Sequence, residues 1–391
     1  MSSGSSHPIV VDVLDSQHNA IKMWGPNSPG GSEAAMAPVM APSDAPVSLP
    51  TIDLSMWHDE EYRTELASQI AADAHTMGFF YVKAPQAVSS FTWSNVNSTL
   101  AMCVKVFEET AEAERIKLAG PSNLQMLHGY QKFASQLGSL SQRAASTKEC
   151  LAVGRLLACD RCDTVGGTRA TDISVSDCPH ESYPPAIRDF PSTVNQLRSS
   201  MEQVAQVLLD MFSLSLGQPI HFLRDLHQNP RSPLRLHHYP PTPHDPSVPV
   251  SERAIAAAEH TDYGTITLLL MARNDPGGLQ VWLRDAAKWM DIPYREDCLV
   301  VNIGDLLMRW TNDRYVSNVH RVLVPETAIQ QSVHRYSIAY FVTPAKETPI
   351  VPLLVSSAAA GGEQAKYPVV TAGEYGDAKR AANFQAQKSL A

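Results

Sequence analysis

The sequence has 391 residues, of which 44% are hydrophobic and 18% are charged, and its formal net charge at pH 7 is −9. This composition is typical of a globular protein and excludes an intrinsically disordered chain. The negative charge argues against nucleic acid as a partner, because such binding depends on clustered Lys and Arg. The chain has no run of eighteen apolar residues and does not open with a secretory signal pattern, so we expect a cytoplasmic protein without a membrane span.

The N-terminal part of the chain changes character near residue 48. Residues 1–48 are rich in Ser, Pro, Gly and Ala without a sustained hydrophobic period, which predicts a flexible N-terminal extension. The next section, residues 49–185, opens with an extended stretch and an amphipathic helix that ends near Met77. Gly78 then precedes an aromatic and β-branched cluster at 79–82, which predicts a strand.

The rest of this section is less regular. A helical pattern covers residues 88–119, and residues 124–146 predict a loop with short extended pieces. Residues 159–185 combine Gly, Asp, Ser, Pro and Cys at high density. This composition predicts a long surface insertion or lid.

The six cysteines are scattered, which favours free thiols in a reducing compartment over a disulfide scaffold. One group in the insertion offers soft or borderline ligands at nearly the spacing of a zinc site. The second pair of this group is tighter than usual zinc ligands, so a zinc knuckle and a loop with reduced thiols both stay open. The group consists of Cys159, Cys162, Cys178 and His180.

Residues 186–385 predict a long helix followed by a β-rich core. Ser192 is the predicted N-cap of the helix, whose apolar residues recur every three or four positions until Gly217. From residue 233 to 344 the hydrophobic period changes to two, which indicates a barrel or sandwich packed against the upstream helices. The predicted strands include 234–236, 266–270, 279–282, 298–303, 321–324 and 336–341.

A candidate metal site lies in this β-rich part. His260 and Asp262 are two residues apart, so on an extended chain their side chains point to the same face. His320 starts a predicted strand and can be brought alongside them by strand pairing. An H-x-D pair alone occurs often by chance, but two histidines and a carboxylate form the facial triad of non-haem Fe(II) oxygenases.

A second pattern raises the significance of the first. Arg335 and Ser337 lie downstream of His320 and share one face of a predicted strand. A guanidinium makes two charge-assisted hydrogen bonds to a carboxylate, and a hydroxyl adds a third. Together these side chains predict a site for the distal carboxylate of a dicarboxylic acid whose other end chelates the metal.

In these residues the chain resembles the isopenicillin N synthase-like branch of the 2-oxoglutarate/Fe(II)-dependent dioxygenases. The resemblance covers residues 48–385 and implies a mixed, β-dominated fold, a double-stranded β-helix (jelly-roll) buttressed by N-terminal and central helices. Further motifs of the family occur in the same order: Pro50-Thr51-Ile52-Asp53-Leu54, Gly78-Phe79-Phe80-Tyr81-Val82, Arg235-Leu236-His237-His238-Tyr239-Pro240, Gly277-Gly278-Leu279-Gln280-Val281, Asn302-Ile303-Gly304-Asp305 and Ser317-Asn318-Val319-His320-Arg321.

The resemblance also implies the chemistry. It implies Fe(II), 2-oxoglutarate and O₂, with ascorbate as a candidate reductant, and the hydroxylation, desaturation or oxidative cyclisation of a small metabolite with release of succinate and CO₂. Tyr239 and His237 are implied contacts of 2-oxoglutarate. Because Asp262 supplies a carboxylate, no coordination position is left for halide, and halogenation is not expected. The chain departs from plant members at His237-His238, where they have Asn-Tyr, and in a longer loop at 325–331.

Two other functions stay open at this point. An oxidase that uses no 2-oxoglutarate would bind a carboxylate of its substrate at Arg335 and Ser337. A non-catalytic jelly-roll binding protein would be favoured by loss of a metal ligand, yet all three are present. We expect a monomer that binds a small-molecule substrate, with four candidate contacts that could equally pack in the core: Tyr130, Tyr263, Trp282 and Phe341.

Overall fold

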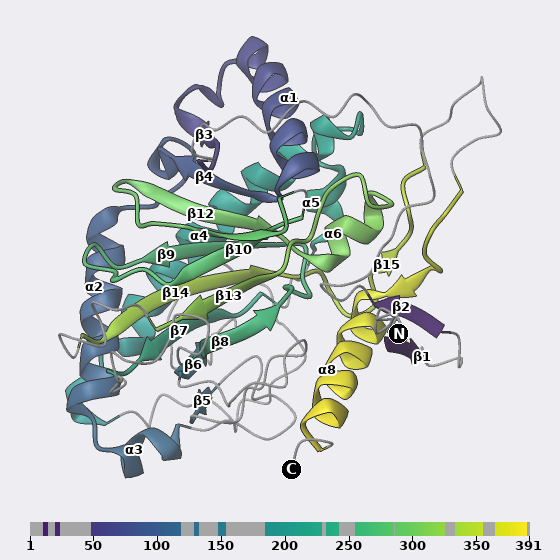
Figure 1. Cartoon of the computed structure of the whole chain (residues 1–391). Helices are drawn as coiled ribbons and strands as arrows, with labels where there is room; N and C mark the ends of the chain where they lie inside the picture. The colour runs from purple at the N-terminus through teal and green to yellow at the C-terminus, as the bar shows by residue number, and fades with distance from the viewer. Residues whose placement is uncertain are drawn as a thin grey trace.

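The computed structural model has a β-rich core with helices packed around it (Figure 1). None of the helices in the described part of the chain is long and apolar enough to cross a membrane. The structure describes residues 11–14, 20–23, 48–118, 129–132, 148–153, 184–228, 232–241, 255–284, 286–324, 333–354 and 364–388.

The main sheet has eight strands in the order β3-β4-β12-β9-β14-β7-β6-β5. Its first pair, β3 and β4, is parallel, and its other neighbours are antiparallel. Four of the eight strands come from residues before 186, so the N-terminal section and the core share one sheet. The strands are β3 (Thr51–Asp53), β4 (Phe79–Lys83), β12 (Cys298–Ile303), β9 (Ile266–Met271), β14 (Arg335–Val342), β7 (Leu234–Tyr239), β6 (Glu149–Val153) and β5 (Gly129–Gln131).

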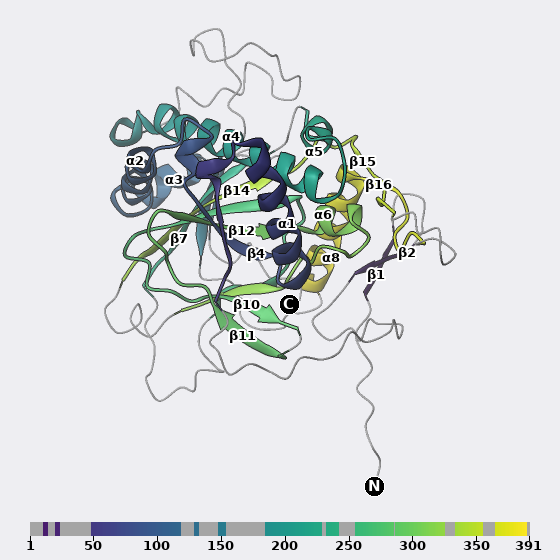
Figure 2. The ribbon, with the colours of Figure 1, turned by 90° about the horizontal axis from the view of Figure 1, so that it is seen from above.

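A second sheet of four strands has the order β11-β10-β13-β8. Figure 2 shows β10 and β11 on one side of the main sheet, with α2 (Trp93–Val104) and α4 (Phe190–Ser215) on the other. This two-sheet arrangement confirms the predicted jelly-roll core. The four strands are β11 (Lys288–Asp291), β10 (Leu279–Leu283), β13 (His320–Leu323) and β8 (Ile255–His260).

The two faces of the main sheet have different neighbours, because side chains alternate along each strand. Ile338 of β14 belongs to the large apolar cluster that includes α1 (Glu60–Thr76) and α4. Tyr239, the cross-strand partner of Arg335, packs in a smaller cluster with Val281 of β10. The face toward the second sheet is called the inner face below; it carries Arg235, His237 and Tyr239 on β7, Thr267, Leu269 and Met271 on β9, and Arg335, Ser337, Ala339 and Phe341 on β14.

The helices confirm most of the sequence-based elements, with one correction. The region 88–119 contains α2, a π-helical turn and α3 (Glu112–Lys117), and α4 spans the long predicted helix. Ser192 is not the N-cap of α4, because the helix begins at Phe190 with Asp189 as its N-cap residue. Pro191 fits the first turn, where a missing N–H costs little, and the Ser192 hydroxyl donates back to the Asp189 carbonyl at 2.9 Å.

Several features differ from the sequence-based expectations or fall outside the described residues. The strand β8, which ends at His260, and the helices α6 (Asp305–Trp310) and α8 (Ala372–Lys388) were not predicted. Two short strands, β1 (Val11–Leu14) and β2 (Ala20–Met23), pair within the predicted N-terminal extension. Outside the described residues lie the zinc candidates Cys159, Cys162, Cys178 and His180, almost all of the predicted insertion, and the loop at 325–331.

Candidate active site

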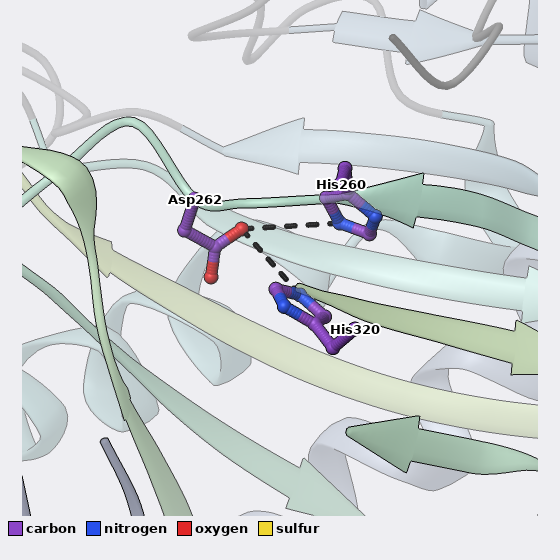
Figure 3. Close-up of side chains that lie close together, drawn as sticks. All are labelled: His260, Asp262 and His320. Atoms are coloured by element: carbon purple, nitrogen blue, oxygen red, sulfur yellow. Dashed lines mark ion pairs between the residues drawn. The ribbon is translucent and has the colours of Figure 1, made fainter. Parts of the chain in front are cut away.

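Three side chains with metal-binding atoms meet where β8 and β13 pair (Figure 3). His260 is the last residue of β8 and His320 is the first of β13, and the two are direct register partners. The Oδ1 atom of Asp262 lies 3.9 Å from Nε2 of His260 and 3.8 Å from Nε2 of His320. All three donor atoms lie within 4.8 Å of one another, close enough for a single ion to contact all three.

Backbone carbonyls fix the orientation of both histidines. The Nδ1 atom of His260 is 2.7 Å from the carbonyl of Ala258, and that of His320 is 3.2 Å from the carbonyl of Asn318. These contacts place the proton on Nδ1 and leave the Nε2 lone pair facing Asp262. Burial, followed by the neighbouring His320, lowers the pKa of His260 to about 3, so its imidazole is neutral at pH 7 and available as a ligand.

The Asp262 carboxylate is oriented by two strands of the main sheet. Its Oδ2 accepts a hydrogen bond of 2.6 Å from the Thr267 hydroxyl and one of 2.8 Å from the Asn302 side-chain amide. Oδ1 is thereby left to face both histidines. Burial alone would raise the pKa of Asp262, but the two histidines and these hydrogen bonds hold it below its ordinary value, so the group is an anion. The sequence alone assigned neither Thr267 nor Asn302 a role at the metal site, although Asn302 belongs to one of the motifs shared with the family.

The turn after β8 lies so close to the segment after β12 that glycine is required. A Cβ on Gly304 would lie 2.2 Å from the carbonyl oxygen of Gly264. This close approach lets the Asp305 amide donate to the Asp262 carbonyl at 2.8 Å and the Leu306 amide donate to the Gly264 carbonyl at 3.0 Å. The Asn302-Ile303-Gly304-Asp305 motif thus holds the backbone of the turn that carries the Asp262 ligand.

Arg335 and Ser337 both lie buried on the inner face, with 3% and 2% of their surfaces exposed. Arg335 donates from Nε to Oδ1 of Asp275 at 3.2 Å, and its guanidinium carbon is 4.8 Å from the centre of the Tyr239 ring. Its Nη1 is buried without a hydrogen-bond partner among the described residues. A buried guanidinium with a free donor is suited to bind a carboxylate.

Comparison with known proteins agrees with this combination of a metal triad and a buried arginine. The sequence pattern described as "2OG-Fe(II) oxygenase superfamily" matches residues 230–344, which include the triad and Arg335. The chain belongs to the 2OG-Fe(II) oxygenase superfamily. It is a 2-oxoglutarate/Fe(II)-dependent dioxygenase, and its cofactors are Fe(II) and 2-oxoglutarate.

Fungal proteins are among the relatives of this oxygenase. The 2-oxoglutarate-dependent dioxygenase tropC of Talaromyces stipitatus is 25% identical over 311 residues, covering 78% of this chain and 89% of tropC. The 2-oxoglutarate-Fe(II) type oxidoreductase hxnY of Emericella nidulans is 28% identical over 332 residues, which cover 84% of this chain and 88% of hxnY. The crystal structure of full-length Neurospora crassa T7H in complex with α-KG has a TM-score of 0.68 at 26% identity and covers 87% of this chain and 98% of T7H.

The described residues of the oxygenase are suited to bind both Fe(II) and 2-oxoglutarate. Two imidazoles and one carboxylate are the donor set of non-haem Fe(II) sites, and the buried Nη1 of Arg335 offers a hydrogen-bond donor for a carboxylate of 2-oxoglutarate. A non-catalytic binding protein would have no need for a carboxylate whose free oxygen faces two oriented imidazoles. That alternative is therefore discarded.

Tyr239 and His237 lie on the inner face, as the register partners of Arg335 and Ser337. His237 is buried, and its Nδ1 has no hydrogen-bond partner among the described residues. Burial, reinforced by nearby positive groups that include Arg235 and Arg335, lowers the pKa of His237 well below its ordinary value. This histidine is therefore neutral at pH 7.

Two of the four candidate substrate contacts lie near the metal ligands. Tyr263 directly follows Asp262, and the ammonium of Lys379 lies 5.2 Å from the centre of its ring. Phe341 is on the inner face opposite Thr267, which binds Asp262. The guanidinium carbon of Arg235 lies 5.2 Å from the centre of the Phe341 ring, a contact that the sequence analysis did not anticipate.

The structure does not bring the other two candidates to the metal ligands. Val281 is the register partner of His320, so the next residue, Trp282, faces the opposite side of the second sheet. There its ring packs against Trp289 with the ring centres 5.3 Å apart. Tyr130 packs in the large apolar cluster on the helix side of the main sheet, and its hydroxyl donates to the Glu149 carboxylate.

Proposed function

We propose that this dioxygenase couples the oxidative decarboxylation of 2-oxoglutarate to the oxidation of a C–H bond in a small metabolite, with release of succinate and CO₂. When bound, Fe(II) and 2-oxoglutarate supply the activation of O₂. The observation that carries the proposal is the free Oδ1 of Asp262, which lies within 3.9 Å of Nε2 of both His260 and His320. The chain's own contribution is to hold these donors, to bind the two substrates side by side and to exclude water.

We further propose that Arg335 and Ser337 bind the distal carboxylate of 2-oxoglutarate, with Tyr239 and His237 beside it. Asp275 fixes one edge of the Arg335 guanidinium and leaves Nη1 available. The neutral state of His237 is consistent with a hydrogen-bonding contact that adds no further positive charge. The Nη1 donor of Arg335 can add a charge-assisted hydrogen bond to a carboxylate of this dianionic co-substrate.

The metabolite is proposed to bind near Phe341 and Tyr263. Phe341 shares the inner face with Arg335 and lies across from Thr267, the residue that orients Asp262. Tyr263 follows Asp262 in the same turn. Aromatic side chains at these two positions provide apolar surface close to the ligands, where the target C–H bond has to be placed.

A succinate-release screen tests the proposed function. The anaerobically prepared Fe(II) protein is mixed with 2-oxoglutarate, oxygenated buffer and fractions of a metabolite pool, and succinate and oxidised products are measured by mass spectrometry. We expect some fractions to stimulate succinate release in proportion to product, and the Asp262→Ala variant to release none. Oxygen consumption and product formation without loss of 2-oxoglutarate would instead support the oxidase alternative.

We also propose that the enzyme works as a monomer in the cytoplasm. The thiols of Cys103 and Cys298 are buried and reduced, which supports a reducing compartment. Size-exclusion chromatography with light scattering measures the mass in solution, which should be that of one chain. A mass of two chains would contradict the monomer.

A further inference from the structure

A single buried carboxylate connects the two segments that carry the metal ligands. Asp305, the first residue of α6, is 2% exposed. Its Oδ2 accepts a hydrogen bond of 3.1 Å from the hydroxyl of Thr261, which stands between His260 and Asp262. Its Oδ1 accepts one of 2.7 Å from the hydroxyl of Ser317, three residues before His320 in the chain. Asp305 therefore links the turn after β8 to the start of β13.

The counter-charge of this carboxylate comes from the C-terminal helix. The Nζ atom of Lys379 on α8 lies 2.8 Å from Oδ2 of Asp305 and 3.3 Å from the hydroxyl oxygen of Thr261. Tyr375, one helical turn earlier, donates its hydroxyl to the same Oδ2 at 2.8 Å. The Lys379 and Asp305 side chains are only 7% and 3% exposed, so the ion pair is shielded from water.

Lys379 neutralises the buried carboxylate of Asp305, which would be uncompensated without it. A buried ion pair that loses one partner leaves an uncompensated charge, and this is strongly unfavourable. Here the uncompensated charge would be the Asp305 carboxylate. The backbone amide of the same residue donates to the Asp262 carbonyl at 2.8 Å. The carboxylate would be driven to reorient toward water, and its hydrogen bonds to Thr261 and Ser317 would weaken. Both ligand-bearing segments would then lose a common anchor.

We propose that Lys379 is a positioning residue of the metal centre: through Asp305 and Thr261 it holds the donors of His260, Asp262 and His320 in the arrangement that binds one metal ion. The C-terminal helix α8 then contributes to metal binding in addition to packing against the core. This inference rests on the metal triad of the proposed function but on neither its substrate nor its reaction, so it is tested by metal binding alone.

The test compares three variants of the full chain. Lys379→Met removes the charge and keeps the length of the side chain, and Lys379→Arg keeps the charge. Arg380→Met is the matched control, because Arg380 is the next residue of α8, is exposed and pairs with Asp377. Anaerobic titration calorimetry measures the Kd for Mn(II), and thermal unfolding without metal measures the stability of each fold.

Lys379→Met should weaken Mn(II) binding by roughly 10–100-fold, the usual effect of losing a group that orients a metal ligand. Lys379→Arg should recover most of the affinity, and Arg380→Met should bind like the unmodified chain. If Lys379 only fastens α8 to the core, Lys379→Met would lower the melting temperature and leave the Kd unchanged, which overturns the proposal. Wild-type protein that binds no Mn(II) would contradict the metal site itself.

A second variant keeps the proposal testable if Lys379→Met does not fold. Thr261→Val removes the hydroxyl that joins Asp305 to the metal-binding turn and leaves the Lys379–Asp305 ion pair in place. The proposal predicts roughly tenfold weaker Mn(II) binding by folded Thr261→Val. A wild-type Kd in this variant would refute the link between Asp305 and the metal ligands.

Discussion

Replacing Arg335 should weaken 2-oxoglutarate binding and lower the free energy of unfolding, and the two effects can be measured separately. Its buried Nη1 has no protein partner among the described residues, so the proposed carboxylate contact would be lost in Arg335→Ala. Truncating one partner of a buried charge pair costs about 2–5 kcal/mol. The apparent constant for 2-oxoglutarate should therefore rise roughly thirtyfold or more. Arg335→Lys should recover only part of this loss, because an ammonium lacks the planar fork of donors.

The loss in the free energy of unfolding comes from Asp275. Its side chain is inaccessible to solvent and pairs with the Arg335 guanidinium, with Nε and Oδ2 3.1 Å apart. Arg335→Ala leaves this carboxylate buried and unpaired, which should lower the free energy of unfolding by about 3–5 kcal/mol. In Arg335→Met/Asp275→Asn both charges are absent, so most of the stability should return while the weak binding of 2-oxoglutarate remains.

The assay combines initial rates at varied 2-oxoglutarate with urea unfolding of each variant. Mn(II) affinity without co-substrate should be nearly unchanged in all of them, which separates this role from metal binding. An unaltered constant for 2-oxoglutarate in Arg335→Ala, together with loss of affinity for the organic substrate, would refute the reasoning. The carboxylate bound by Arg335 would then belong to that substrate.

Three further predictions concern the metal ligand, the pH dependence of stability and the N-terminus. Asn302→Ala removes a hydrogen bond to Asp262 and should weaken Mn(II) binding by roughly tenfold or more, and an unchanged Kd in calorimetry would contradict this role. Burial lowers the pKa of His227 from 6.5 to about 4. The unfolded chain then takes up its proton first, so the free energy of unfolding should fall by about 3 kcal/mol from this group as the pH drops from 6.5 to 4. Urea unfolding of His227→Gln should show a smaller decline over this range, and an identical pH profile would exclude the contribution. Removing residues 1–47 should preserve the melting temperature and activity, whereas lost activity at normal stability would show that this extension acts at the site.

The sequence predicts the ligands of the metal site from the local spacing of His260 and Asp262 and from the order of the family motifs around His320. His260 and Asp262 are two residues apart on extended backbone, and His320 begins a strand that pairs with β8. The strand β8 itself was missed because its sequence, Ile-Ala-Ala-Ala-Glu-His, is dominated by alanine and has a single β-branched residue. Helix α8 was missed for a related reason: its inward contacts include Tyr375 and Lys379, so it lacks a continuous apolar stripe.

The contacts that orient the ligands do not follow from the local sequence, although Asn302 belongs to one of the shared motifs. Asn302 reaches Asp262 from β12, and Asp275 reaches Arg335 from the loop after β9, so both contacts exist only once the strands are paired. The side on which Trp282 lies was also undetermined, since alternation shows only that Val281 and Trp282 face opposite ways. The pairing of Val281 with His320 decides which of them faces the metal ligands.

Anaerobic titration of the chain with Mn(II) or Fe(II) tests the central claim most directly. We expect one ion per chain, and greatly reduced affinity in His260→Ala and His320→Ala. His58→Ala serves as the control, because His58 is exposed and its Nε2 lies 3.0 Å from the Ala87 carbonyl, away from the metal ligands. A Kd in both His260→Ala and His320→Ala that equals the value of the unmodified chain would contradict the assignment of the metal centre.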